Sequence, residues 1–182
     1  MPILGVIASS ITGNLNPPAL QGDYWALSTT TLSGAASSIT FTGIPQNFTH
    51  LQVRAYYSMA SAGVLKMNFN TDTGANYKSH WVYADGSSTQ AGVSSVSPNA
   101  INSGYIGAGS SFGATIIDIL DYTNTIKNKV ARSLDGNDRN GAGDVELSSG
   151  LWINTNPITS ITLAGQNGNL GIYSSFALYG VK

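Results

Sequence analysis

The sequence predicts an all-β protein: a single jelly-roll-like antiparallel β-sandwich with an extended N-terminal arm. Apolar and polar residues alternate with a period of two in one segment after another. Clusters of Gly, Asn, Asp and Ser separate these segments at intervals of roughly 8–12 residues, as turns do between short strands. No window shows the 3.6-residue period of an amphipathic helix. An immunoglobulin-like or lectin-type sandwich is the alternative topology.

Around ten strands are expected from this alternation. The expected strands cover residues 24–32, 38–42, 50–56, 64–69, 77–83, 101–106, 113–120, 125–134, 145–153, 158–163 and 171–181. Three of these strands carry residues that are expected to share the core face: Ile39 and Phe41 in 38–42, Leu51, Val53 and Ala55 in 50–56, and Leu65, Met67 and Phe69 in 64–69. Residues 84–97 are rich in Ser and Gly and predict a long loop, and residues 135–143 predict a turn.

The chain divides into an arm, residues 1–23, and a sandwich body, residues 24–182. The arm has no charged residue before Asp23, and Asn16-Pro17-Pro18 interrupts any regular structure. Its apolar tip consists of Ile3, Leu4, Val6 and Ile7. We expect this tip to anchor the protein on a neighbouring subunit. A disordered tail or a first strand of the body is the alternative.

The composition limits the classes of function. Charged residues make up only 9% of the 182 residues, against roughly 25% in an ordinary soluble domain, and the net charge is −1. Such a surface repels its neighbours little, which suits a subunit packed among others. The eight basic residues are scattered, so we expect no binding to nucleic acid. No run approaches the ~20 apolar residues of a membrane span, and the N-terminus does not resemble a secretory signal.

Residues 135–146 are rich in oxygen ligands. Asp135, Asn137 and Glu146 occupy the first, third and twelfth positions of this segment, as in a calcium-binding loop. Arg139 at the fifth position, and a Gly one place late, depart from that pattern. Asn, Asp and Gly are also the residues that a tight turn requires. We therefore expect a turn and no metal or cofactor, with a cation site as the alternative.

The sequence offers little for catalysis. His50 and His80 lie in strands without the spacing of a catalytic triad, and Cys is absent. Asp118 and Asp121 are expected to face opposite ways. Glu146 is the only Glu, and a structural role for these carboxylates is expected, such as pairing with Lys127 or Arg132 on a neighbouring strand. We therefore expect no enzymatic activity and no catalytic residues.

One strand carries an aromatic stripe. Tyr77, Ser79, Trp81 and Tyr83 share a face of the segment 77–83. Exposed aromatic rings in this arrangement could stack on sugars and so bind host-surface glycans. A core face of the sandwich is the alternative, and the exposure of Trp81 and Tyr83 distinguishes the two.

The whole chain resembles the small structural proteins of tailed bacteriophages, particularly those of cyanobacterial and marine phages. The resemblance rests on residues 1–10 (MPILGVIASS), on residues 39–45 (ITFTGIP) with residues 49–54 (THLQVR), and on residues 175–182 (SFALYGVK). These segments resemble the start, the first strand pair and the closing strand of such proteins. They contain no active-site motif.

The resemblance implies a location in the virion, on the capsid surface or the tail. It implies a capsid decoration (cement) protein that contacts the major capsid protein and forms a homo-oligomer, commonly a trimer. The alternative is a tail fibre or baseplate subunit, or an adhesin that binds glycans. No internal repeat of the kind found in fibre shafts is present.

Overall fold

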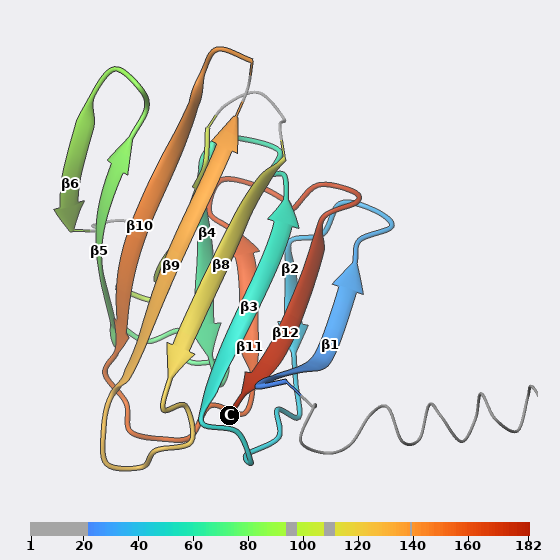
Figure 1. The fold of residues 1–182 in the computed structure, drawn as a ribbon, viewed down its shortest axis with the longest axis vertical. Coiled ribbons are helices and arrows are strands. Elements are labelled where there is room, and N and C mark those ends of the chain that lie inside the picture. The colour runs from blue at the N-terminus through green and yellow to red at the C-terminus, as the bar shows by residue number, and fades with distance from the viewer. Residues whose placement is uncertain (1–21, 94–97, 108–111, 139) are drawn as a thin grey trace, which may run out of the picture.

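The computed structural model describes residues 22–93, 98–107, 112–138 and 140–182. Twelve strands follow one another in these residues (Figure 1). Their bounds are β1 Tyr24–Thr31, β2 Ser38–Phe41, β3 His50–Tyr57, β4 Gly63–Phe69, β5 Tyr77–Ala84, β6 Thr89–Val93, β7 Ile101–Ile106, β8 Gly113–Leu120, β9 Lys129–Asp138, β10 Gly143–Trp152, β11 Ile161–Gly165 and β12 Ser175–Val181. The predicted arm, with Ile3, Leu4, Val6 and Ile7, lies outside the described residues. The described residues form no helix, and hence none that could cross a membrane.

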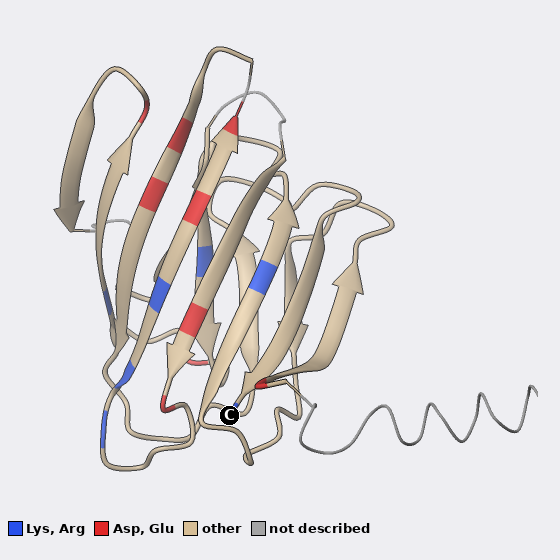
Figure 2. Ribbon diagram, viewed as in Figure 1, with Lys and Arg blue, Asp and Glu red and all other residues tan. Residues whose placement is uncertain are grey.

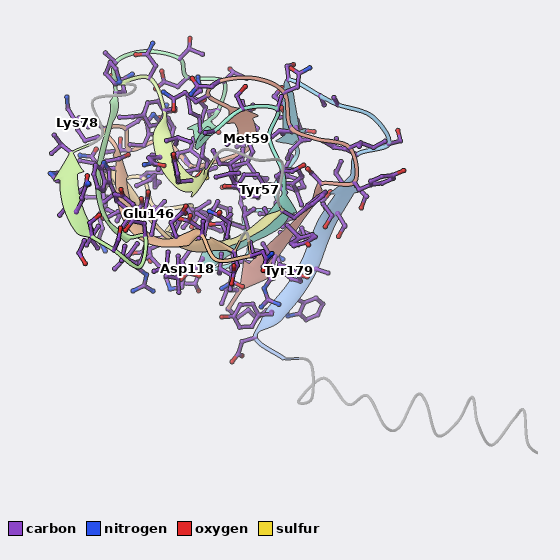
Figure 3. The ribbon with its side chains drawn as sticks, turned by 90° about the horizontal axis from the view of Figure 1, so that it is seen from above. Tyr57, Met59, Lys78, Asp118, Glu146 and Tyr179 are labelled. Carbon is purple, nitrogen blue, oxygen red and sulfur yellow. The ribbon has the colours of Figure 1, made fainter. Side chains whose placement is uncertain are left out.

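The strands form two antiparallel sheets that pack face to face, as the predicted all-β sandwich requires. The large sheet has the order β1-β12-β3-β8-β9-β10-β5-β6, and the small sheet has the order β2-β11-β4-β7. Figure 3 shows the two layers from above, with Tyr57 and Glu146 between them and Asp118 and Tyr179 on the outer side of the large sheet. The jelly-roll topology stays a prediction.

The core lies between the sheets and follows the predicted alternation. Leu65, Met67 and Phe69 of β4 are fully buried, and Leu51, Val53 and Ala55 of β3 face them from the large sheet. At one end, the ring of Trp152 stacks on Tyr77 and tilts against Phe69, with centroid distances of 6.3 and 5.5 Å. The closing strand β12 lies between β1 and β3, inside the large sheet.

The large sheet has eight strands and the small sheet four, so the large sheet extends beyond the edge of the small one. β7 is an edge strand of the small sheet and packs against β9 and β10 of the large one. Beyond it, β5 and β6 extend the large sheet (Figure 1). The small sheet ends at β7, so the inner faces of β5 and β6 are only partly covered.

Three sequence predictions were wrong. Residues 84–97 are not one long loop, because β6 pairs with β5 from Ala84↔Thr89 to His80↔Val93. The strand predicted at residues 125–134 begins instead at Lys129, and it continues to Asp138 through residues assigned to a turn. The inward side chains of Asp135 and Asn137 explain the error, since both lie in the strand and bond to β7.

Candidate functional site

The inward-facing side chains of β5 become more exposed along the strand. Tyr77 and Ser79 are buried in the core, whereas Trp81 and Tyr83 are half-buried. All four point inward, because successive side chains of a strand alternate between faces. Their different exposure follows from their place in the sheet, since Trp81 and Tyr83 lie beyond the cover of the small sheet. The stripe is thus part core and part open surface.

A pocket of about 250 Å³ opens beside these two rings. It is lined by Val64 of β4, Trp81 and Tyr83 of β5, Asn102 and Tyr105 of β7, and Glu146 of β10. The rings of Trp81 and Tyr83 have centroids 5.7 Å apart and are tilted by 56°. Their ring faces therefore form two inclined walls. Sequence reasoning missed Asn102 and Tyr105, because their position depends on how β7 packs across the sheets.

Glu146 is the acidic residue of this pocket, and only 5% of its surface is exposed. Its Oε1 accepts hydrogen bonds from Nδ2 of Asn102, at 3.1 Å, and from the hydroxyl of Ser148. Burial raises the pKa of Glu146, and the bonds from Ser148 and Asn102 oppose this rise. The structural pairing with Lys127 or Arg132 is made by Asp121 and Asp118 and not by Glu146. Glu146 faces inward, whereas Arg132 faces outward and pairs with Asp118 at 3.3 Å.

Asp135 lies next to Glu146 in the same cross-strand row, behind the pocket. Its Oδ2 accepts a hydrogen bond from the backbone N–H of Tyr105 at 3.0 Å, and its Oδ1 has no hydrogen-bond partner among the described residues. Burial raises the pKa of Asp135 to about 8, although the bond from Tyr105 lowers it; the nearby charges of Glu146 and Asp144 raise it further. At neutral pH this carboxyl therefore keeps its proton for most of the time.

Polar side chains of the large sheet bond to the backbone of β7. The register of β4 and β7 shifts between Val64 and Lys66, so the ladder between them is interrupted. Side chains of the large sheet supply acceptors for β7 instead: Ser79 Oγ for the N–H of Asn102, and Asp135 for Tyr105. This role accounts for Asp135 and Ser79. It does not account for the two open rings of Trp81 and Tyr83.

The predicted candidates Asp135, Asn137 and Glu146 lie in the paired strands β9 and β10, in which Asp135 and Glu146 are cross-strand partners. In the described part of the chain, no three His, Asp or Glu side chains are grouped so as to hold a metal ion.

Asp121 follows β8 and pairs with Lys127 at 3.2 Å. His50 Nδ1 accepts a hydrogen bond from the N–H of Asp121 at 3.0 Å.

The outer face of the large sheet is the second candidate surface. One cross-strand row runs through Ile116, Leu134, Leu147 and Val82, and a second contains Leu120 and Val130. These side chains, together with Val145, are between 39% and 55% exposed. Between the two rows lies the ion pair of Asp118 and Arg132. Figure 2 shows where charged residues fall along the strands of this sheet.

Comparison of the chain with protein-family models, with curated proteins and with solved structures finds no match.

Proposed function

We propose that this chain is a non-catalytic structural subunit of a phage virion, a capsid decoration protein that associates with further copies of itself through the outer face of the large sheet. The sequence resemblance at both ends and in the first third supports the virion assignment. The apolar rows on the outer face carry the proposal of self-association. The same surface would serve a tail subunit, which is the alternative location.

The extent of the apolar surface supports a protein contact. At ~4.8 Å between strands and ~3.3 Å per residue, the apolar rows over β5, β8, β9 and β10 cover about 20 by 25 Å. The largest apolar patch on a typical monomer is roughly 300–600 Å² and is often functional. The full eight-stranded face, at roughly 900 Å², matches the ~800 Å² that each partner of a standard interface buries.

The charges on this face favour a second copy as the occupant. Asp118 and Arg132 lie side by side near its centre. In a two-fold contact each copy would place its Arg132 opposite the other copy's Asp118, so that both pairs are satisfied reciprocally. The net charge of −1 gives little repulsion between copies.

The test of self-association is sedimentation of the full chain over a range of concentrations. We expect a concentration-dependent oligomer, and Leu134→Lys should weaken the association at least tenfold because it places a charge in the centre of the apolar row. The matched control is Ile126→Lys, since Ile126 is 85% exposed but lies in the turn after β8. A wild-type chain that stays monomeric at all concentrations, or equal effects of the two variants, would overturn this contact.

The virion assignment is tested by immunogold electron microscopy of purified phage particles with an antibody against the chain. Label over the heads supports the decoration protein. Label confined to the tail overturns decoration in favour of the tail subunit. Particles without label would overturn the assignment to a virion.

A further inference from the structure

We propose that the pocket between β5, β7 and β10 binds one neutral hexopyranose ring of a glycan, stacked on Trp81 or Tyr83 and hydrogen-bonded by Glu146 and Asn102. This inference goes beyond assembly, because the pocket lies on the inner face of the large sheet, away from the proposed contact. A self-associated subunit would therefore keep it accessible.

The size of the pocket limits the ligand. Pockets that hold drug-sized molecules have volumes of roughly 300–1,000 Å³. At about 250 Å³ this pocket takes a single sugar ring, and further units of the glycan would extend outward. Its floor is part of a paired sheet, since Trp81 and Tyr83 face Ser148 and Glu146 across the β5–β10 ladder. The site is therefore formed before the ligand arrives.

The two aromatic rings provide the apolar contact. Aromatic faces carry partial negative charge, and the axial C–H groups of a pyranose are weakly positive, so the two pack face to face. The ring of Trp81 leans over Gly92 of β6, where an added Cβ would come within 3.0 Å of Cζ2. Gly92 thus leaves room for this orientation of the indole.

The polar groups suit hydroxyl ligands. Both hydrogen bonds described for Glu146 end on Oε1, so Oε2 takes part in neither. Asn102 donates to Glu146 through Nδ2, and among the described residues its Oδ1 accepts a single long bond of 3.4 Å, from the N–H of Gly104. Two acceptor atoms at neighbouring positions match the adjacent hydroxyl groups of a sugar.

The charge around the pocket excludes acidic sugars. None of the described residues that line it is Lys or Arg. Asp144 lies close enough to Glu146 to raise the pKa of that carboxyl, so a further negative charge in the pocket is disfavoured. A uronic acid or sulfated sugar would therefore bind more weakly than its neutral counterpart.

A quaternary ammonium ion is the competing ligand, because aromatic rings with a carboxylate also form cages for such cations. One observation favours the sugar. Asn102 offers hydrogen-bonding atoms that a methylated ammonium ion cannot use.

The experiment is a saturation-transfer NMR screen and titration of the full chain with methyl glycosides of glucose, galactose and mannose in both anomers. Methyl glucuronide and choline serve as the anionic and cationic comparisons. We expect at least one neutral glycoside to bind in the millimolar range or tighter. Absence of binding by every neutral glycoside would overturn the proposal, as would tighter binding of choline or glucuronide.

Variants assign the binding to this pocket. Trp81→Ala and Glu146→Gln should each weaken binding at least tenfold, and Trp81→Phe should retain part of it, since a ring face remains. The matched control is Tyr56→Ala, because Tyr56 is an exposed aromatic residue of the same sheet but points to the outer face. Unchanged affinity in Trp81→Ala, or an equal loss in Tyr56→Ala, would overturn the assignment. If Trp81→Ala fails to fold, Trp81→Phe and Glu146→Gln carry the test.

Discussion

The backbone N–H of Tyr105 donates a hydrogen bond of 3.0 Å to Asp135, and this bond joins the edge of the small sheet to the inner face of the large one. An edge strand enclosed by protein would otherwise leave a backbone donor without a partner. The Asp135 carboxyl group therefore supplies the acceptor that a neighbouring strand would supply in a continuous sheet. It is buried by the same contact, and burial raises its pKa to about 8.

This burial predicts that the protein loses stability as the pH rises. The unfolded chain releases the Asp135 proton near pH 4, whereas the folded protein keeps it up to about pH 8. The free energy of unfolding should therefore fall between these pH values, by up to about 1.4 kcal/mol per pH unit, and level off above pH 8. Asp135→Asn keeps an acceptor for Tyr105 but cannot ionise, so its slope should be shallower. Urea unfolding at pH 5, 6, 7 and 8.5 measures both slopes.

Glu146 contributes a slope of the same sign, because burial also raises its pKa. Asp135→Asn should therefore flatten the pH dependence without removing it, and the double variant with Glu146→Gln should flatten it further. Asp72, whose pKa is lowered by its hydrogen bond from Trp152, acts only at more acidic pH. Identical slopes for wild type and Asp135→Asn would contradict the burial of an unionised carboxyl group.

A second prediction concerns the close approach of β7 to β10. An added Cβ at Gly150 would lie 2.3 Å from Cγ2 of Ile101, so Gly150→Ala should destabilise the protein by about 1–3 kcal/mol. Combining it with Ile101→Ala should destabilise less than the sum of the two single changes, because the clash is then absent. The control is Gly34→Ala, which meets no atom within 4 Å. Chemical denaturation measures all four variants, and strict additivity would contradict this contact.

Local pattern sufficed for strands whose apolar residues alternate, as in β3 and β4. It failed for β6, whose residues TQAGV show no such alternation. That strand depends on its ladder with β5, and on a turn in which Oδ1 of Asp85 accepts the N–H groups of Ser87 and Ser88. Both Asp85 bonds are local, and an Asp-Gly-Ser-Ser sequence was a usable signal for a hairpin turn.

The site was only half predictable for a similar reason. The period of two placed Trp81 and Tyr83 on one face, but their exposure depends on where the small sheet ends. Asn102 and Glu146 are 44 residues apart and meet only because β7 packs on β10. Asp135 and Asn137 are residue types typical of turns, and the local sequence could not show their role in a strand. That role depends on Tyr105, which lies some 30 residues earlier.

A third prediction concerns Lys129, whose side chain is completely buried. Its Nζ donates to the backbone carbonyls of Asn124, Lys127 and Thr155, at 2.6, 2.9 and 3.0 Å, and so joins two loops. Lys129→Met keeps the length of the side chain but leaves three acceptors without their donor. It should destabilise the protein by about 2–4 kcal/mol in urea unfolding. Lys127→Met, at an exposed ion pair, should change stability by less than about 1 kcal/mol. Equal stabilities of the two variants would contradict this role.

The last prediction concerns the arm. If Ile3, Leu4, Val6 and Ile7 are buried on a neighbouring virion subunit, each contributes about 1.5–3 kcal/mol before the cost of ordering the arm. Deletion of residues 1–15 should therefore abolish the protein's occupancy on particles. It should leave the unfolding midpoint unchanged, because β1 begins only at Tyr24. Self-association through the outer face should also persist, which separates the two contacts. Mass spectrometry of purified particles measures the occupancy, and an unchanged value after the deletion would contradict an anchoring arm.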